Sequence, residues 1–149
     1  MKVTFCGHGT IHNSDDVKRW LYKVVKDVII LGGDTFYLGG YGTFDYIAKQ
    51  VVWELKEEYP HIESLLVIPY LDKKYDLEKY DSSIYPSLEN VPKRFAISKR
   101  NEWMVKESHM VISYVTHSWG GAATTMEYAK KKKKTIINYP QSVEERGVL

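Results

Sequence analysis

The feature that most constrains the fold is the regular alternation of short apolar segments with longer segments of helical periodicity. The short segments have the length and composition of β-strands, and they occur at residues 2–6, 35–38, 64–70, 110–115 and 135–138. Amphipathic helical patterns lie between them, and this alternation is typical of a parallel sheet connected by helices. The sequence therefore predicts an α/β protein, a single Rossmann-like domain whose five-stranded, mostly parallel sheet carries helices on both faces.

The clearest helix follows Asn13, which is predicted to be its N-cap residue. Asp15 and Asp16 come next, where negative charge suits the positive end of the helix dipole. Apolar residues then recur at helical spacing from Val17 to Val28. This pattern predicts a long helix that packs one face against the sheet.

The composition excludes several classes of protein. The chain has 149 residues, of which 44% are hydrophobic and 27% charged, as in an ordinary folded domain. No apolar run approaches the about 20 residues that a membrane helix needs, and the apolar N-terminal stretch is too short for a signal peptide. Cys6 is the only cysteine and the histidines are scattered, so we expect a cytoplasmic protein with no disulfide, metal, cofactor or membrane partner.

The net charge of +2 is low, and for that reason nucleic acid is expected to be an unlikely partner. The basic residues concentrate in the run Lys130 to Lys134. This run is interpreted as a solvated helix end, where lysines favour the negative pole of the dipole. The alternative is an edge that attracts phosphate.

Three glycine-bearing turns follow predicted strands, at residues 7–9, 39–42 and 120–121. Ligands of open α/β sheets bind outside the carboxyl ends of the strands, where these turns are expected to meet. Glycine lets the backbone approach a ligand closely, and the helix that follows such a turn offers free N–H groups to phosphate. The turns therefore predict a nucleotide-like ligand. His8 is either a ligand contact or a turn residue.

Four segments also resemble the signature of a known superfamily. Residues 100–105, 111–113 and 118–121 resemble the signature of the SLOG superfamily, and residues 39–45 resemble its other glycine turn. This superfamily joins the DNA-processing protein DprA, the Lonely Guy phosphoribohydrolases and sensor domains for nucleotide-derived signals. The resemblance extends from the first strand to Asn138, apart from residues 71–96, and implies the Rossmann-like fold.

The enzymes of this superfamily carry a G-G-x-G-T-x-x-E motif and an arginine on the preceding helix. By resemblance, Thr124 takes the threonine place, Glu127 the glutamate place and Arg100 the arginine place. The implied roles are orientation of the ligand by Arg100 and assistance to N-glycosidic bond cleavage by Glu127, since a carboxylate suits a transition state with positive charge on the sugar. Ala123 departs from the motif because its methyl group replaces a glycine.

Two functions follow as alternatives. The first is binding of a nucleotide or nucleotide-derived signal of the ADP-ribose or NAD type, by a sensor or a sequestering protein. The second is catalysis by Arg100 and Glu127, as a nucleoside-phosphate N-glycosidase like the Lonely Guy enzymes or as a deoxyribosyltransferase-like enzyme. The residues expected to bind the ligand and its phosphate are Gly7, His8, Gly39, Gly40, Gly42, Asp45, Asn101, Ser118, Gly120, Gly121 and Thr124.

The domain is expected to span residues 1–140, followed by a polar tail at 141–149. Within it, residues 71–96 show no sustained periodicity and are expected to form an irregular insertion. A loop of this length is uncommon unless it is functional, so it is predicted to be a lid over the site or an oligomer contact. The resemblance implies a homodimer or a higher homo-oligomer.

Overall fold

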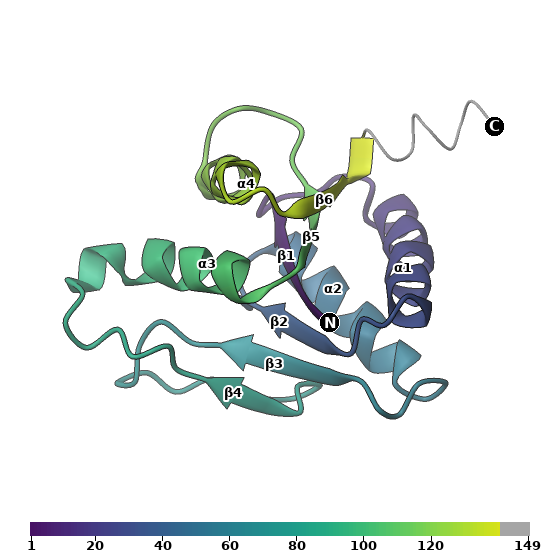
Figure 1. Ribbon diagram of the computed structural model, residues 1–149, viewed down its shortest axis with the longest axis horizontal. Helices are drawn as coiled ribbons and strands as arrows, with labels where there is room; N and C mark the ends of the chain where they lie inside the picture. The colour runs from purple at the N-terminus through teal and green to yellow at the C-terminus, as the bar shows by residue number, and fades with distance from the viewer. Residues whose placement is uncertain (141–149) are drawn as a thin grey trace.

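Six parallel strands form one sheet in the computed structural model, which describes residues 1–140 (Figure 1). Their order across the sheet is β4-β3-β2-β1-β5-β6. The parallel α/β architecture with helices on both faces is confirmed, but the expected number of five strands is wrong. The strands are β1 (Lys2–Gly7), β2 (Thr35–Leu38), β3 (Glu63–Val67), β4 (Ser82–Ile84), β5 (Met110–Tyr114) and β6 (Thr135–Asn138).

Two helices cover each face of the sheet (Figure 1). On one face, α1 and α2 bury a large apolar cluster against β1 and β2, and on the other α3 and α4 bury two smaller clusters. The 3-10 turn η1 leads directly into α3. The helical elements are α1 (Ser14–Ile30), α2 (Thr43–Leu55), η1 (Lys93–Phe95), α3 (Ala96–Glu107) and α4 (Gly121–Lys131). None of the described helices combines the length and the apolar character needed to cross a membrane.

The start of α1 differs in detail from the expected cap. Asn13 precedes the helix, but its side chain makes no capping hydrogen bond. Its amide instead donates to the Tyr139 hydroxyl at 3.2 Å and accepts from the Tyr114 hydroxyl at 3.3 Å. Asn13 therefore connects the start of α1 to the last residue of β5 and to the residue that follows β6.

The chain changes direction across the sheet at β1. It runs outward from β1 through β2 and β3 to β4, and then returns to place β5 on the other side of β1. The carboxyl ends of β1 and β5 therefore form the switch point of the sheet, where ligands of open α/β folds bind.

The strand that the sequence did not predict, β4, lies inside residues 71–96. It pairs only with β3, and its three residues are partly exposed. Because it is a short, polar edge strand, it lacks the apolar run that marks the buried strands. The expectation of an irregular insertion is therefore wrong for this part of the segment, whereas the tail at 141–149 lies outside the described residues.

Asp81 fixes the start of β4. Its carboxylate accepts a hydrogen bond from the backbone N–H of Ser64 at 2.8 Å and forms an ion pair with Lys56 at 2.7 Å. The backbone N–H of Asp81 also donates to the carbonyl of Ser64 at 2.8 Å. This end of the segment is thus attached to the sheet.

Replacing Asp81 with alanine is expected to release β4. The free energy of unfolding should fall by about 1–2 kcal/mol, since a hydrogen bond to a charged group is lost. Amide exchange at residues 80–84 should accelerate, as hydrogen-exchange mass spectrometry can measure. Glu78→Ala is the control, because Glu78 is exposed in the same segment. Equal exchange in both variants would show that Asp81 does not anchor the strand.

Candidate functional site

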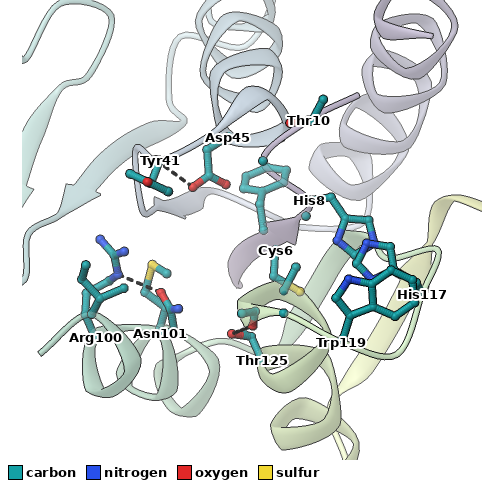
Figure 2. A pocket seen from close by; sticks show the side chains of 18 residues that line it. Cys6, His8, Thr10, Tyr41, Asp45, Arg100, Asn101, His117, Trp119 and Thr125 are labelled. Atoms are coloured by element: carbon teal, nitrogen blue, oxygen red, sulfur yellow. Dashed lines mark hydrogen bonds between the residues drawn. The ribbon is translucent and has the colours of Figure 1, made fainter. Parts of the chain in front are cut away.

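A cavity of about 490 Å³ lies at the switch point of the sheet (Figure 2). Its floor is the end of β1, and its walls come from the loop after β5 with the start of α4, from the turn before α2, and from α3. These four segments are far apart in the sequence. The parallel register aligns the ends of β1 and β5, with Gly7 opposite Tyr114, so the segments meet at one edge.

The start of α4 forms one wall of the cavity. Gly120 precedes the helix with a φ of 92°, a conformation that favours glycine. A Cβ atom at Gly120 or at Gly121 would have no heavy atom within 4 Å. The space over these glycines is therefore open, and the first-turn N–H groups of a helix have no intrahelical partner. An anion fits this position.

Three glycines of the other two turns, Gly7, Gly40 and Gly42, are required for packing. A Cβ atom at Gly7 would lie 2.3 Å from the Phe44 ring, and one at Gly42 would lie 2.8 Å from the Cα atom of Gly9. At Gly40, the nearest atom would be a methyl carbon of Leu66 at 2.6 Å. Packing inside the protein thus accounts for these three glycines without a ligand.

Arg100 is buried, with 4% of its surface exposed. One Nη atom donates to the carbonyls of Gly39 and Val67, each at 2.9 Å, and Nε donates to the Asn101 side chain at 2.8 Å. Burial lowers the pKa of Arg100, while the negative charge of Asp45 raises it. Arg100 therefore connects α3 to the ends of β2 and β3 as well as lining the cavity.

Asp45 places a carboxyl group in the cavity (Figure 2). Burial raises the pKa of Asp45 to about 6, against the opposing effects of the Tyr41 N–H, which donates to Oδ2 at 3.1 Å, and of Arg100. The neighbouring thiol of Cys6 is also perturbed, because burial and the charge of Asp45 raise its pKa to about 12. Cys6 is therefore protonated at neutral pH and is no nucleophile.

Three aromatic rings form a stack at the rim of the cavity (Figure 2). The ring centroids of His8 and His117 are 3.7 Å apart, and those of His117 and Trp119 are also 3.7 Å apart. Nε2 of His8 accepts a hydrogen bond from the backbone N–H of Thr116 at 2.8 Å. Burial and the adjacent His117 lower the pKa of His8. The stack ends in Trp119, which is 69% exposed.

Asp45→Asn is expected to change how stability depends on pH. The pKa of Asp45 in the folded protein, about 6, exceeds the ordinary value of 3.8, so ionisation destabilises the fold as the pH rises from about 4 to about 6. The variant should therefore be more stable than the unmodified protein by about 1–2 kcal/mol at pH 8, and the difference should vanish near pH 4. Urea denaturation at several pH values measures this. A difference that does not vary with pH would contradict it.

The cavity brings together seven of the predicted site residues. Ser118 is not among the residues that line it, and Gly39 and Gly40 line an adjoining cavity. Gly42 precedes α2 and contacts Gly9. The seven residues in the cavity are Gly7, His8, Asp45, Arg100, Asn101, Gly120 and Gly121.

The structure does not bring Glu127 to Arg100. The Glu127 side chain is 70% exposed and pairs with Lys130 at 3.2 Å. Glu127 and Thr124 are three residues apart on α4, so they share a face, and both line a hollow that Arg100 does not reach. Thr125 lies in the cavity instead, with its hydroxyl donating to the Gly121 carbonyl at 2.9 Å.

The sequence analysis missed several residues of the cavity. His117 is not among the residues that the sequence predicts for the site, yet it stacks on His8 beyond the ends of β1 and β5. Thr10, Tyr41 and Thr125 also line the cavity. Pairing of the first and fourth predicted strands would have revealed the contact of His8 and His117, but the sequence does not specify which strands pair.

Solved structures of similar fold are known, although no protein-family model and no curated protein matches the sequence. One is DNA processing protein A from Helicobacter pylori, with a TM-score of 0.65 and 17% identity, covering 99% of this chain and 73% of that chain. DprA from Streptococcus pneumoniae has a TM-score of 0.66 and 18% identity, and the match covers 92% of this chain and 49% of that chain. The molybdenum cofactor carrier protein from Chlamydomonas reinhardtii has a TM-score of 0.58 and 15% identity, and the match covers 92% of this chain and 75% of that chain. This chain thus corresponds to about half of the Streptococcus pneumoniae protein.

These similarities confirm the fold that the SLOG resemblance implies. They also overturn the expectation that nucleic acid is an unlikely partner, because the Helicobacter pylori structure was described for its single-stranded DNA binding mode. The error lay in arguing from net charge. The net charge of +2 averages over the whole surface, whereas contacts to phosphate depend on local groups.

Proposed function

We propose that the cavity at the switch point binds a nucleotide or a nucleotide-derived ligand of the ADP-ribose type. The observation that carries the proposal is the open start of α4, where Gly120 and Gly121 leave space beside free N–H groups. The first turn of α4 contains no acidic residue that would compete with a phosphate. A phosphate group in this position gains the positive end of the helix dipole.

The rest of the cavity suits the other parts of a nucleotide. Trp119 exposes an indole ring whose position is fixed by His117 and His8 behind it. Stacking of a base on an aromatic side chain contributes about 1–3 kcal/mol. The carboxyl group of Asp45 accepts hydrogen bonds from sugar hydroxyls when it is ionised. The cavity thus offers one group for each part of a nucleotide.

The positions of Arg100 and Glu127 favour ligand binding over N-glycosidic cleavage as the function. The carboxylate of Glu127 lies outside the cavity and pairs with Lys130. Hydrogen bonds to backbone carbonyls and to Asn101 occupy Arg100. We therefore propose a sensor or a sequestering protein, with no turnover that depends on Glu127.

The experiment is a calorimetric titration of the unmodified protein and of Gly121→Val with adenosine monophosphate. Because the valine side chain would fill the phosphate position while meeting no protein atom at its Cβ, the affinity should fall about 30-fold, or about 2 kcal/mol. Thr124→Val is the matched control, since Thr124 is exposed in the same helical turn but lies outside the cavity. Its affinity should stay within about twofold. Equal affinities of Gly121→Val and the unmodified protein would refute the proposed phosphate position.

A second titration uses a 5′-phosphorylated single-stranded oligothymidylate, because a strand presents the same phosphate chemistry as a free nucleotide. If the strand occupies the proposed site, Gly121→Val weakens it and adenosine monophosphate competes with it. If oligothymidylate binding is unaffected by Gly121→Val and by adenosine monophosphate, the nucleic-acid surface lies elsewhere on the molecule.

A further inference from the structure

A second cavity, of about 360 Å³, adjoins the first. It lies beyond the ends of β2 and β3, and residues 69–80 form its outer wall. Tyr41, Ile97 and Arg100 line both cavities. Each cavity has a volume within the range of small-molecule sites. The two cavities are therefore neighbouring parts of one cleft along the edge of the sheet.

We propose that the second cavity binds the distal half, a ribose phosphate with or without a base, of a pyrophosphate-linked nucleotide such as ADP-ribose, whose proximal half occupies the first cavity. The inference rests on the proposed function, because it places the proximal phosphate at Gly121. It adds a site that borders Gly39 and Gly40 and whose outer wall, residues 69–80, lies mostly outside the SLOG resemblance.

The charges of the second cavity favour an anion. Nζ of Lys49 lies 5.4 Å from the Tyr80 ring, and Nζ of Lys73 lies 4.5 Å from the Tyr70 ring. Within residues 1–140, neither ammonium group has a carboxylate partner within 4 Å. Asp76 is the one acidic residue among those lining the cavity. The excess positive charge is therefore available to a diphosphate.

The tyrosines supply surfaces for a sugar and a ring. Tyr70, Tyr75 and Tyr80 line the cavity. Burial, followed by the charges of Asp45 and Asp76, raises the pKa of Tyr80 to about 12, so its hydroxyl is neutral and adds no negative charge. The Tyr70 hydroxyl donates to the Lys93 carbonyl at 3.0 Å, which fixes the ring beside Lys73. Aromatic faces beside ammonium groups suit a planar ring linked to phosphate.

The boundary between the two cavities lies at the shared residues. Arg100 is fixed there by its bonds to the Gly39 and Val67 carbonyls. Tyr41 and Ile97 complete the boundary and are 79% and 45% exposed. Because Tyr41 and Ile97 are exposed to solvent, the proposed linking diphosphate crosses this boundary from the solvent side, beside the positive charge of Arg100 that the fold holds in place.

The test compares adenosine monophosphate with ADP-ribose by calorimetry. The unmodified protein should bind ADP-ribose at least about 30-fold more tightly, since only ADP-ribose reaches the second cavity. In Lys49→Gln/Lys73→Gln, the affinity for ADP-ribose should fall by about tenfold or more, whereas that for adenosine monophosphate should stay within about twofold. Lys74→Gln is the matched control, because Lys74 neighbours Lys73 but does not line the cavity. It should leave both affinities unchanged.

The outcomes separate this inference from the proposed function. If adenosine monophosphate binds and depends on Gly121, but ADP-ribose binds no more tightly or ignores the double variant, the second site is refuted while the proposed function stands. If neither ligand binds, both fail. If the double variant weakens only the binding of an oligothymidylate, the second cavity holds a nucleic-acid strand and the inference of a pyrophosphate-linked nucleotide is overturned.

Discussion

Arg100→Met is expected to lower the free energy of unfolding by about 3–5 kcal/mol, the largest effect of any single substitution considered for this protein. Methionine fills much of the same volume but donates no hydrogen bond. The carbonyls of Gly39 and Val67 then lose the guanidinium that bonds to them, and Asp45 loses its nearby positive charge. An unsatisfied buried polar group costs about 1–3 kcal/mol. Urea denaturation monitored by circular dichroism measures the change.

The control for this prediction is Arg94→Met. Arg94 is exposed and lies over the Phe95 ring, so its loss should cost less than about 1 kcal/mol. If Arg100→Met costs no more than Arg94→Met, then Arg100 does not hold the edge of the sheet together. The role of Arg100 would then be limited to contact with a ligand.

Gly7→Ala is expected to lower the free energy of unfolding by about 3 kcal/mol. The added methyl group would lie 2.3 Å from the Phe44 ring, and Phe44 is fully buried. Because the core is close-packed, the ring or β1 must shift to accommodate it. The same denaturation experiment detects this loss of stability.

Gly9→Ala is the matched control, two residues further along the same turn. A Cβ atom at Gly9 would meet nothing within 4 Å, so this change should alter the free energy of unfolding by less than about 0.5 kcal/mol. Equal effects at Gly7 and Gly9 would contradict the packing explanation and would restore the phosphate interpretation of this turn.

The glycine turns illustrate how far the sequence determined the candidate site. The sequence placed all three turns at strand ends, and the glycines of the first and third line the cavity at the switch point. It could not distinguish the reasons for the glycines. Gly7 lacks a side chain because Phe44 occupies that space, whereas Gly121 faces open space. This distinction depends on tertiary packing and leaves no local pattern.

The elements show a similar division. The helix from Ser14 to Ile30 and the strand from Met110 to Tyr114 were predicted closely because their apolar residues follow a clear period. The strand at Ser82–Ile84 was missed because it is short, polar and at the edge of the sheet. On α4, Thr125 rather than the motif residue Thr124 lines the cavity. A shift of one residue on a helix turns a side chain by about 100°, and the motif alone does not fix that phase.

The central claim is that the start of α4 binds the phosphate of a nucleotide. The most direct measurement is a titration of the ¹⁵N-labelled protein with adenosine monophosphate, followed by amide chemical shifts. If the start of α4 binds the phosphate, the largest chemical shift changes occur at the backbone amides of Gly121 and Ala122, and the Trp119 indole N–H shifts as well. No shift at these groups, or the largest shifts around Tyr128 and Lys130 in the separate hollow beside α4, would contradict it.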